Sequence, residues 1–182
     1  MKMKKKLIRV LRAYSRSVDV INEYIGQGVS WLTTLLVLVF CIDVIIRYVF
    51  KSSSVAFYEA EWHIFSIIFL VGAGYSLKHD RHVRVDVFYS RFNFQAKAWV
   101  NFFGVLLFLL PFAVLVIKAS IPYVAMSYRI NEGSADAGGL PYRYLIKSAM
   151  IIGFALLLIQ GIALMVNSLL VILGVQKSAD DR

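Results

Sequence analysis

The sequence predicts an all-α integral membrane protein with four transmembrane helices. The chain has 182 residues, of which 59% are hydrophobic, and its mean hydropathy is +0.69. Soluble domains are only about 45–50% apolar. Four runs are long enough to cross a bilayer, which takes about 20 apolar residues at about 1.5 Å of helix rise each. No run has a polar face wide enough to meet water, which argues against the buried helices of a soluble bundle.

The four predicted spans follow one another in a single membrane domain, 1–182. They cover residues 29–50, 55–77, 98–121 and 144–174. The last run has 31 residues, or about 46 Å of helix, so we expect it to tilt or to protrude from the bilayer. Pro111 predicts a kink within the third span.

The segment before the first span, 4–26, is predicted to form an amphipathic helix at the membrane surface. Its apolar residues recur at helical spacing with Lys and Arg between them, namely Leu7, Leu11, Tyr14, Val18, Ile21 and Ile25. This pattern is typical of a helix that lies on anionic lipid. The basic residues interrupt any continuous apolar core, which argues against a cleavable signal peptide. A solvated tail that extends the helix of the first span is the alternative.

The distribution of Lys and Arg predicts that both termini lie in the cytoplasm. Seven of these residues lie in the segment up to Gly28, five lie in 78–97 and two follow Gly174, whereas the other two connections hold three. The connection 78–97 is therefore predicted to be a cytoplasmic loop, and 122–143 a periplasmic loop. The net charge of +9 then faces lipid phosphates, and no nucleic-acid partner is expected.

The predicted cytoplasmic loop contains the stretch KHDRHVRVDVFYSRF. Val85, Phe88, Tyr89 and Phe92 stand at i, i+3, i+4 and i+7, which predicts a short interfacial helix between spans two and three. The polar and aromatic residues assigned to this interfacial loop are His82, Arg84, Asp86, Tyr89 and Arg91. His79 and His82 have a spacing that suits a shared metal, but no third ligand is evident, so we interpret them as solvated loop histidines.

Ionisable residues within spans one and two predict a polar cluster inside the bilayer. Asp43 and Arg47 are four residues apart, as are Glu59 and His63. The short connection predicts an antiparallel hairpin that brings Arg47 level with Glu59, and Asp43 level with His63. A register shifted by two residues would place Glu61 opposite Arg47 instead. Because charges at this depth should pair, we expect the cluster to hold the hairpin together or to contact a partner helix; a proton or ion relay is the alternative.

One side of span four carries small and amide residues, namely Ala149, Gly153, Gln160 and Asn167. Small residues let helices approach closely, and amides form hydrogen bonds between helices. This side is predicted to pack within the protein or on another subunit.

No motif in the sequence identifies an enzyme or a complete transporter. The chain has no HExxH, P-loop or CxxC motif, and its single cysteine, Cys41, cannot form an internal disulfide. It also lacks the internal repeat and paired broken helices that build a transporter's midplane site. We therefore expect no catalytic, cofactor-binding or metal-binding residues, and we predict a membrane scaffold or accessory subunit.

Three stretches resemble the small membrane subunit, the DctQ component, of the tripartite ATP-independent periplasmic (TRAP) transporters. They are RYVF, EAEWHIFSIIFLVGAGYSLKHDRHVRVDVFYSRF and EGSADAGGLPYRYLIKSAMIIGFALLLIQGIA, and the similarity runs from about Ile21 to Leu173. The resemblance implies a subunit of an importer that takes up organic acids such as carboxylates by using an ion gradient, usually sodium, instead of ATP.

The resemblance also implies the partners and the location. A large membrane subunit would hold the solute and the sodium, so that neither binds to this chain, and a periplasmic solute-binding protein would dock transiently. The complex would lie in the bacterial inner membrane. From the residues alone, the alternative is a small stand-alone transporter or channel that uses the cluster of Asp43, Arg47, Glu59 and His63. A membrane-anchored enzyme is more remote because the chain lacks a catalytic set.

Overall fold

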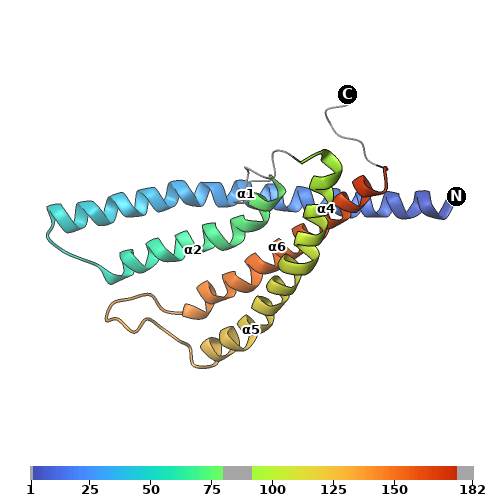
Figure 1. The fold of residues 1–182 in the computed structure, drawn as a ribbon. Helices are drawn as coiled ribbons and strands as arrows, with labels where there is room; N and C mark the ends of the chain where they lie inside the picture. The colour runs from blue at the N-terminus through green and yellow to red at the C-terminus, as the bar shows by residue number, and fades with distance from the viewer. Residues whose placement is uncertain (1, 80–91, 176–182) are drawn as a thin grey trace.

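A computed structural model describes residues 2–79 and 92–175 of the chain, and every regular element in these residues is a helix (Figure 1). Two helices form a hairpin: α1 (Lys2–Val49) and α2 (Val55–Lys78). The third crossing combines α4 (Phe94–Gly104), a π-helical turn (Val105–Leu109) and α5 (Leu110–Arg129). The last helix is α6 (Arg143–Ile172).

Four of these helical runs are long and apolar enough to cross a membrane, namely Lys6–Val49, Val55–Lys78, Phe94–Arg129 and Arg143–Ile172. This confirms the prediction of an all-helical chain with four candidate spans. The third run is longer than predicted at both ends. It begins at Phe94, within the predicted loop 78–97, and it continues through Pro122 to Arg129, so that the following loop covers only 130–142.

The structure differs from the prediction at the N-terminal end. The segments 4–26 and 29–50 are not separate helices but parts of α1, which has 48 residues and is therefore about 72 Å long. Its first half also packs on α6, because Tyr14 Oη donates a hydrogen bond to the Ile159 carbonyl at 3.2 Å. The buried residues of this half are Ser15, Val18 and Asn22. Part of the predicted lipid-facing surface is therefore a packing face of the bundle.

The helix α6 lies at the centre of the bundle and packs against α1, α2, α4 and α5 (Figure 1). Ala149, Gly153 and Gln160, which were predicted to lie on a packing face, are buried, and Asn167 is half-buried. Gly153 lies directly against the backbone of Leu70 in α2, where any Cβ would overlap the Leu70 carbonyl group. The predicted packing face therefore packs within the chain.

The distortion predicted at Pro111 takes the form of the π-helical turn that precedes it. Proline has no N–H group, and its ring clashes with the carbonyl of the residue four positions earlier in a regular helix. In this structure the Leu110 N–H donates to the Val105 carbonyl, five residues back. The wider turn accommodates Pro111 without ending the helix, and the path of the chain bends between α4 and α5 (Figure 1).

Candidate functional site

A buried carboxylate near the start of α2 ties the loop 130–142 to the bundle. Glu59 is 2% exposed and accepts three hydrogen bonds: from Ser134 Oγ at 2.6 Å, from the Leu140 N–H at 2.5 Å and from Arg143 Nη2 at 2.7 Å. At Gly139, a Cβ would overlap the Ser134 side chain and approach Glu59 Oε2. The loop sequence therefore allows three donors to surround one carboxylate.

These contacts replace the predicted pairing across the hairpin. Arg47 does not pair with Glu59 but with Asp43, one turn earlier in α1. His63 does not pair with Asp43, because its Nδ1 atom contacts the backbone carbonyl of Glu59 at 2.5 Å. Arg143, the partner of Glu59, comes from outside the hairpin, although the loop motif GGLPYRY places a basic residue at the start of span four.

Glu61 lies beside the Asp43–Arg47 pair and interacts electrostatically with both residues. This arrangement corresponds to the alternative register, in which Glu61 and not Glu59 faces Arg47. Asp43 is 1% exposed. One buried oxygen of each carboxylate, Asp43 Oδ1 and Glu61 Oε1, has no hydrogen-bond partner within the described part of the chain. Asp43 thus pairs with the Arg47 guanidinium, and Glu61 lies near this pair without an ion pair of its own in the described part of the chain.

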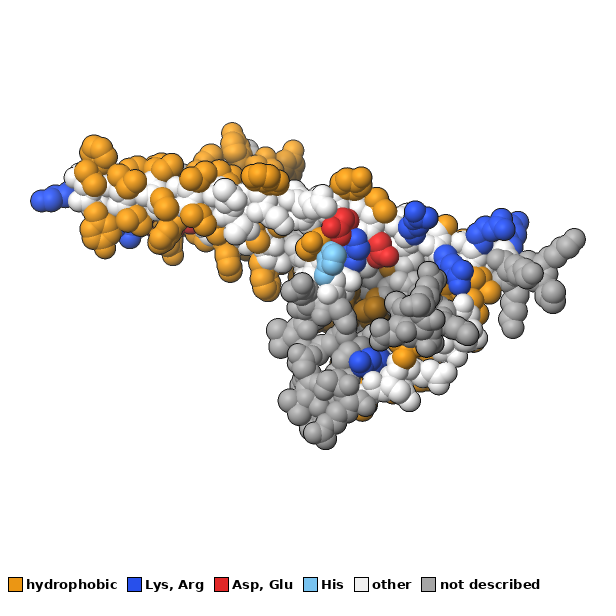
Figure 2. All heavy atoms as spheres, turned by 90° about the horizontal axis from the view of Figure 1, so that it is seen from above, with side chains coloured by type: hydrophobic (Ala, Val, Ile, Leu, Met, Phe, Trp, Pro, Cys, Tyr) orange, Lys and Arg blue, Asp and Glu red, His pale blue; other side chains and the backbone are white. Residues whose placement is uncertain are grey.

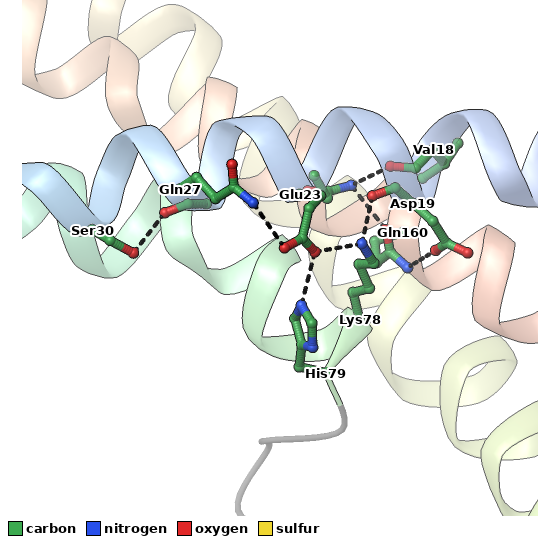
Figure 3. A network of polar contacts seen from close by, with 10 residues as sticks. Val18, Asp19, Glu23, Gln27, Ser30, Lys78, His79 and Gln160 are labelled. Atoms are coloured by element: carbon green, nitrogen blue, oxygen red, sulfur yellow. Dashed lines mark hydrogen bonds and ion pairs between the residues drawn. The ribbon is translucent and has the colours of Figure 1, made fainter.

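A second set of ties joins α1 to α6 near the other end of the bundle (Figure 3). Asn22 Nδ2 donates to Gln160 Oε1 at 2.9 Å, and Gln160 Nε2 donates to Asp19 Oδ1 at 2.9 Å. Gly74 of α2 leaves the space that Asn22 occupies, because a Cβ there would overlap Asn22 Oδ1. Gln160 was predicted to bond between helices, but its partners were missed because they lie in the segment that was assigned to the membrane surface.

The end of α2 is fixed to α1 next to these amides. Lys78 Nζ donates to Glu23 Oε2 at 2.6 Å and to the Asp19 carbonyl at 2.8 Å, and His79 Nε2 lies 2.9 Å from Glu23 Oε2 (Figure 3). His79 is therefore engaged by a carboxylate. The other predicted loop residues, His82, Arg84, Asp86, Tyr89 and Arg91, lie outside the described residues.

The loop 130–142 has one further ion pair with α6. Lys147 Nζ donates to Glu132 Oε2 at 2.5 Å and lies 4.0 Å from the centroid of the Tyr123 ring. The Lys147 ammonium lowers the pKa of the Glu132 carboxyl. Together with the Glu59 contacts, this pair fixes both ends of the loop 130–142 to the helices.

Several polar side chains of the described residues thus bind one another. Among these residues, no group of three or more His, Cys, Asp or Glu side chains could hold a metal ion. Many large hydrophobic side chains, in contrast, are exposed on the surface. Hydrophobic side chains cover the C-terminal half of α1, whereas most of the Lys and Arg visible in this view lie toward its N-terminal half (Figure 2). Large aromatic residues on this helix, such as Trp31 and Tyr48, are about three quarters exposed at 75% and 77%.

The family model described as "Tripartite ATP-independent periplasmic transporters, DctQ component" matches residues 36–171, which is more than half of the chain. The chain belongs to the DctQ family. This confirms the resemblance seen in the sequence. DctQ proteins are components of tripartite transport complexes, together with a large membrane subunit and a periplasmic binding protein, and they are not an enzyme family. Comparisons with curated proteins and with solved structures found no match.

The match to DctQ includes the Glu59 contacts, the Asp43–Arg47–Glu61 group and Gln160. It begins after Asp19, Asn22 and Glu23, which therefore lie outside the matched region. This DctQ-family chain is a multi-pass membrane protein, and its first helix extends well beyond the matched segment.

Proposed function

We propose that this chain is the small scaffold subunit of an ion-coupled TRAP importer for organic acids, with sodium as the coupling ion. It packs against the large membrane subunit in the bacterial inner membrane and stabilises it, while the large subunit binds solute and sodium. The observation that carries this proposal is the saturation of Glu59 by donors of its own chain. A carboxylate that is held in this way is not available to cargo.

The two sets of ties give α2 the rigidity that a scaffold needs. Glu59 holds one end of α2 to the loop and to α6, and Lys78 holds the other end to α1. These two residues are about 28 Å apart along the helix, which is close to the thickness of the hydrocarbon core. The helix is therefore held at both edges of the membrane, where fixed contacts resist tilting.

The packing between these two levels argues against a channel through the chain. Gly153 lies against the backbone of Leu70, between the Glu59 contacts and the Asn22–Gln160 contacts. A proton or ion path needs a continuous series of polar or hydrated groups. Close backbone packing separates the two polar groups, which favours two structural ties over a relay.

The contact between the ends of α1 and α6 supports a common side for both termini. Arg12 Nη2 donates to the Val175 carbonyl at 3.1 Å, so the end of α6 lies beside the first part of α1. The excess of Lys and Arg at this end favours the cytoplasm.

Reconstitution tests this function. Proteoliposomes that contain the large subunit and the solute-binding protein, with and without this chain, are given a sodium gradient and a panel of radiolabelled dicarboxylates, 2-oxo acids and sialic acid. We expect uptake of one solute class only when all three proteins and sodium are present. Equal uptake without this chain, in vesicles that hold the same amount of large subunit, would contradict the scaffold function.

A further inference from the structure

Two grooves lie along the outside of the α1–α2 hairpin. The first has a volume of about 420 Å³. Its lining residues come from both helices and are apolar or aromatic except for Glu61. The second, about 490 Å³, is lined largely by small residues, including Ser30, Thr33, Gly72, Ala73 and Ser76. Small residues at a helix surface let another helix approach closely.

The two grooves form one furrow. On α2, their lining residues follow one another at spacings of three or four residues, from Tyr58 through Glu61 and Phe65 to Phe69 and Gly72. Residues at this spacing share one side of a helix. The same holds on α1, where the lining continues from Gly26 to Phe40. We call this surface, between Gly26–Phe40 of α1 and Tyr58–Ser76 of α2, the α1–α2 furrow.

Much of the packing of α6 on α2 lies away from the furrow. Leu70 and Gly74 of α2, which contact α6, lie on a different side of the helix. In the furrow itself, Phe65 is 57% and Phe69 69% exposed. The furrow is therefore a surface within the candidate spans that meets either lipid or a partner.

The charges at one end of the furrow show what kind of occupant it fits. Asp43 and Glu61 are two carboxyl groups beside the single guanidinium of Arg47, and Asp43 Oδ1 and Glu61 Oε1 are buried without a hydrogen-bond donor in the described part of the chain. Lipid tails offer no donor, so an acyl chain in the furrow would leave both oxygens unsatisfied. One additional cation would pair with the Glu61 carboxyl, which is the member of the group that lines the furrow.

We propose that the α1–α2 furrow seats a transmembrane helix of the large membrane subunit, and that a Lys or Arg of this helix pairs with Glu61. The inference rests on the proposed function, because it presumes that the two subunits associate. The small residues of the furrow let the partner helix approach, and the Asp43–Arg47–Glu61 group fixes its depth through one ion pair.

Site-specific photocrosslinking in native membranes tests the position of the partner. A photoreactive phenylalanine analogue replaces Phe65 or Val37 in the furrow. Phe108 and Leu115 on the third crossing, which are 74% and 64% exposed, serve as matched controls. We expect crosslinks to the large subunit from both furrow positions, at least about tenfold above the controls. Crosslinks to the large subunit from the controls alone, or from the furrow only to lipid or to a second copy of this chain, would overturn the proposal.

Charge variants test the ion pair. We expect Glu61→Lys to reduce the amount of large subunit that co-purifies with the chain by about tenfold or more, whereas Asp136→Lys in the exposed loop leaves it within about twofold. Glu61→Gln, which removes the charge and keeps the shape, should give an intermediate loss. A charge exchange, in which one intramembrane Lys or Arg of the large subunit is changed to Glu, should restore association with Glu61→Lys.

The outcomes separate this inference from the proposed function. If the wild-type chain co-purifies with the large subunit and supports uptake, but Glu61→Lys associates normally, only the furrow assignment is wrong. If the wild-type chain does not associate with the large subunit at all, the scaffold function itself is wrong. Should Glu61→Lys fail to accumulate in the membrane, the crosslinks from Phe65 and Val37 in the otherwise unchanged chain still decide the position of the partner.

Discussion

The Glu59 carboxylate and the Arg143 guanidinium meet at 2.7 Å although 84 positions separate them in the chain. This contact joins the first turns of α2 to the beginning of α6, next to the loop 130–142. Because Ser134 and the Leu140 N–H bind the same carboxylate, one side chain organises a helix pair and a loop at once.

Removal of this carboxylate should loosen the loop. We expect Glu59→Ala to lower the Tm of the chain in detergent by roughly 5 °C or more, because Arg143 and two further donors lose their acceptor inside the protein. Limited proteolysis should show faster cleavage within 130–142. The matched control is Asp136→Ala, an exposed acidic residue of the same loop, for which no change is expected; equal effects from the two variants would contradict the role assigned to Glu59.

Packing of α6 on α2 should depend on Gly153. A Cβ at this position meets the Leu70 backbone, which cannot move aside as a side chain can. Gly153→Ala should therefore destabilise the chain by about 1–3 kcal/mol. Gly104→Ala is the control, because a Cβ at Gly104 meets nothing within 4 Å, and alanine in a helix is neutral or slightly stabilising. Thermal unfolding of both variants would measure this difference, and a stable Gly153→Ala protein would contradict the close packing.

The amide pair between α1 and α6 should show energetic coupling. Asn22 is fully buried, and its amide donates to Gln160. In a double-mutant cycle of Asn22→Ala and Gln160→Ala, we expect a coupling energy of about 0.5–1.5 kcal/mol, which is typical of one buried hydrogen bond. A parallel cycle of Asn22→Ala with Asn167→Ala should show no coupling. The absence of coupling in the first cycle would mean that the N-terminal half of α1 is not anchored through these residues.

Acidification should weaken the attachment of the loop 130–142 through Glu132. The Lys147 ammonium lowers the pKa of the Glu132 carboxyl below its ordinary value of 4.5. A lowered folded-state pKa stabilises the protein above the unfolded-state pKa, and this contribution is lost as the pH falls through the folded-state value. Wild type should therefore lose more stability than Glu132→Gln between about pH 5 and the acid limit of folding. Identical pH profiles of Tm for the two proteins would contradict the pairing.

The topology can be tested with single cysteines. In a Cys41→Ser background, cysteines at Asp136 and at Gln95 are treated with a membrane-impermeant maleimide on intact spheroplasts. If the basic residues orient the chain as proposed, Asp136→Cys is labelled from outside and Gln95→Cys only after lysis. The reverse pattern would place the termini in the periplasm.

The two best-predicted helices show what the sequence determines locally. The predicted spans 55–77 and 144–174 correspond to α2 at Val55–Lys78 and α6 at Arg143–Ile172. Both are bounded by polar or turn-forming residues, and hydropathy alone marks where the lipid-compatible run begins and ends. The packing residues of α6 could also be predicted, because small and amide residues in a span have few uses other than helix contact.

Tertiary contacts explain the two main errors. The segment 4–26 was separated from the first span because Lys and Arg interrupt its apolar residues, but Gly26 lies within α1 and makes room for the Tyr75 ring of α2. The partner predicted for Glu59 was Arg47, its neighbour across the hairpin. The actual partner is Arg143, which follows the loop 130–142 and lies beside α2. Neither contact has a signal in the local pattern.

The most direct test of the central claim, that this chain is framework and carries no solute path, is flux through vesicles that contain the chain alone. Purified chain is reconstituted at high density, and uptake of ²²Na⁺ and of labelled carboxylates is followed under an imposed sodium gradient and membrane potential. We expect flux equal to that of empty vesicles for every solute. Sodium or carboxylate uptake above that level, abolished by neutralising Asp43 and Glu61, would show that the intramembrane charges conduct and would contradict this claim.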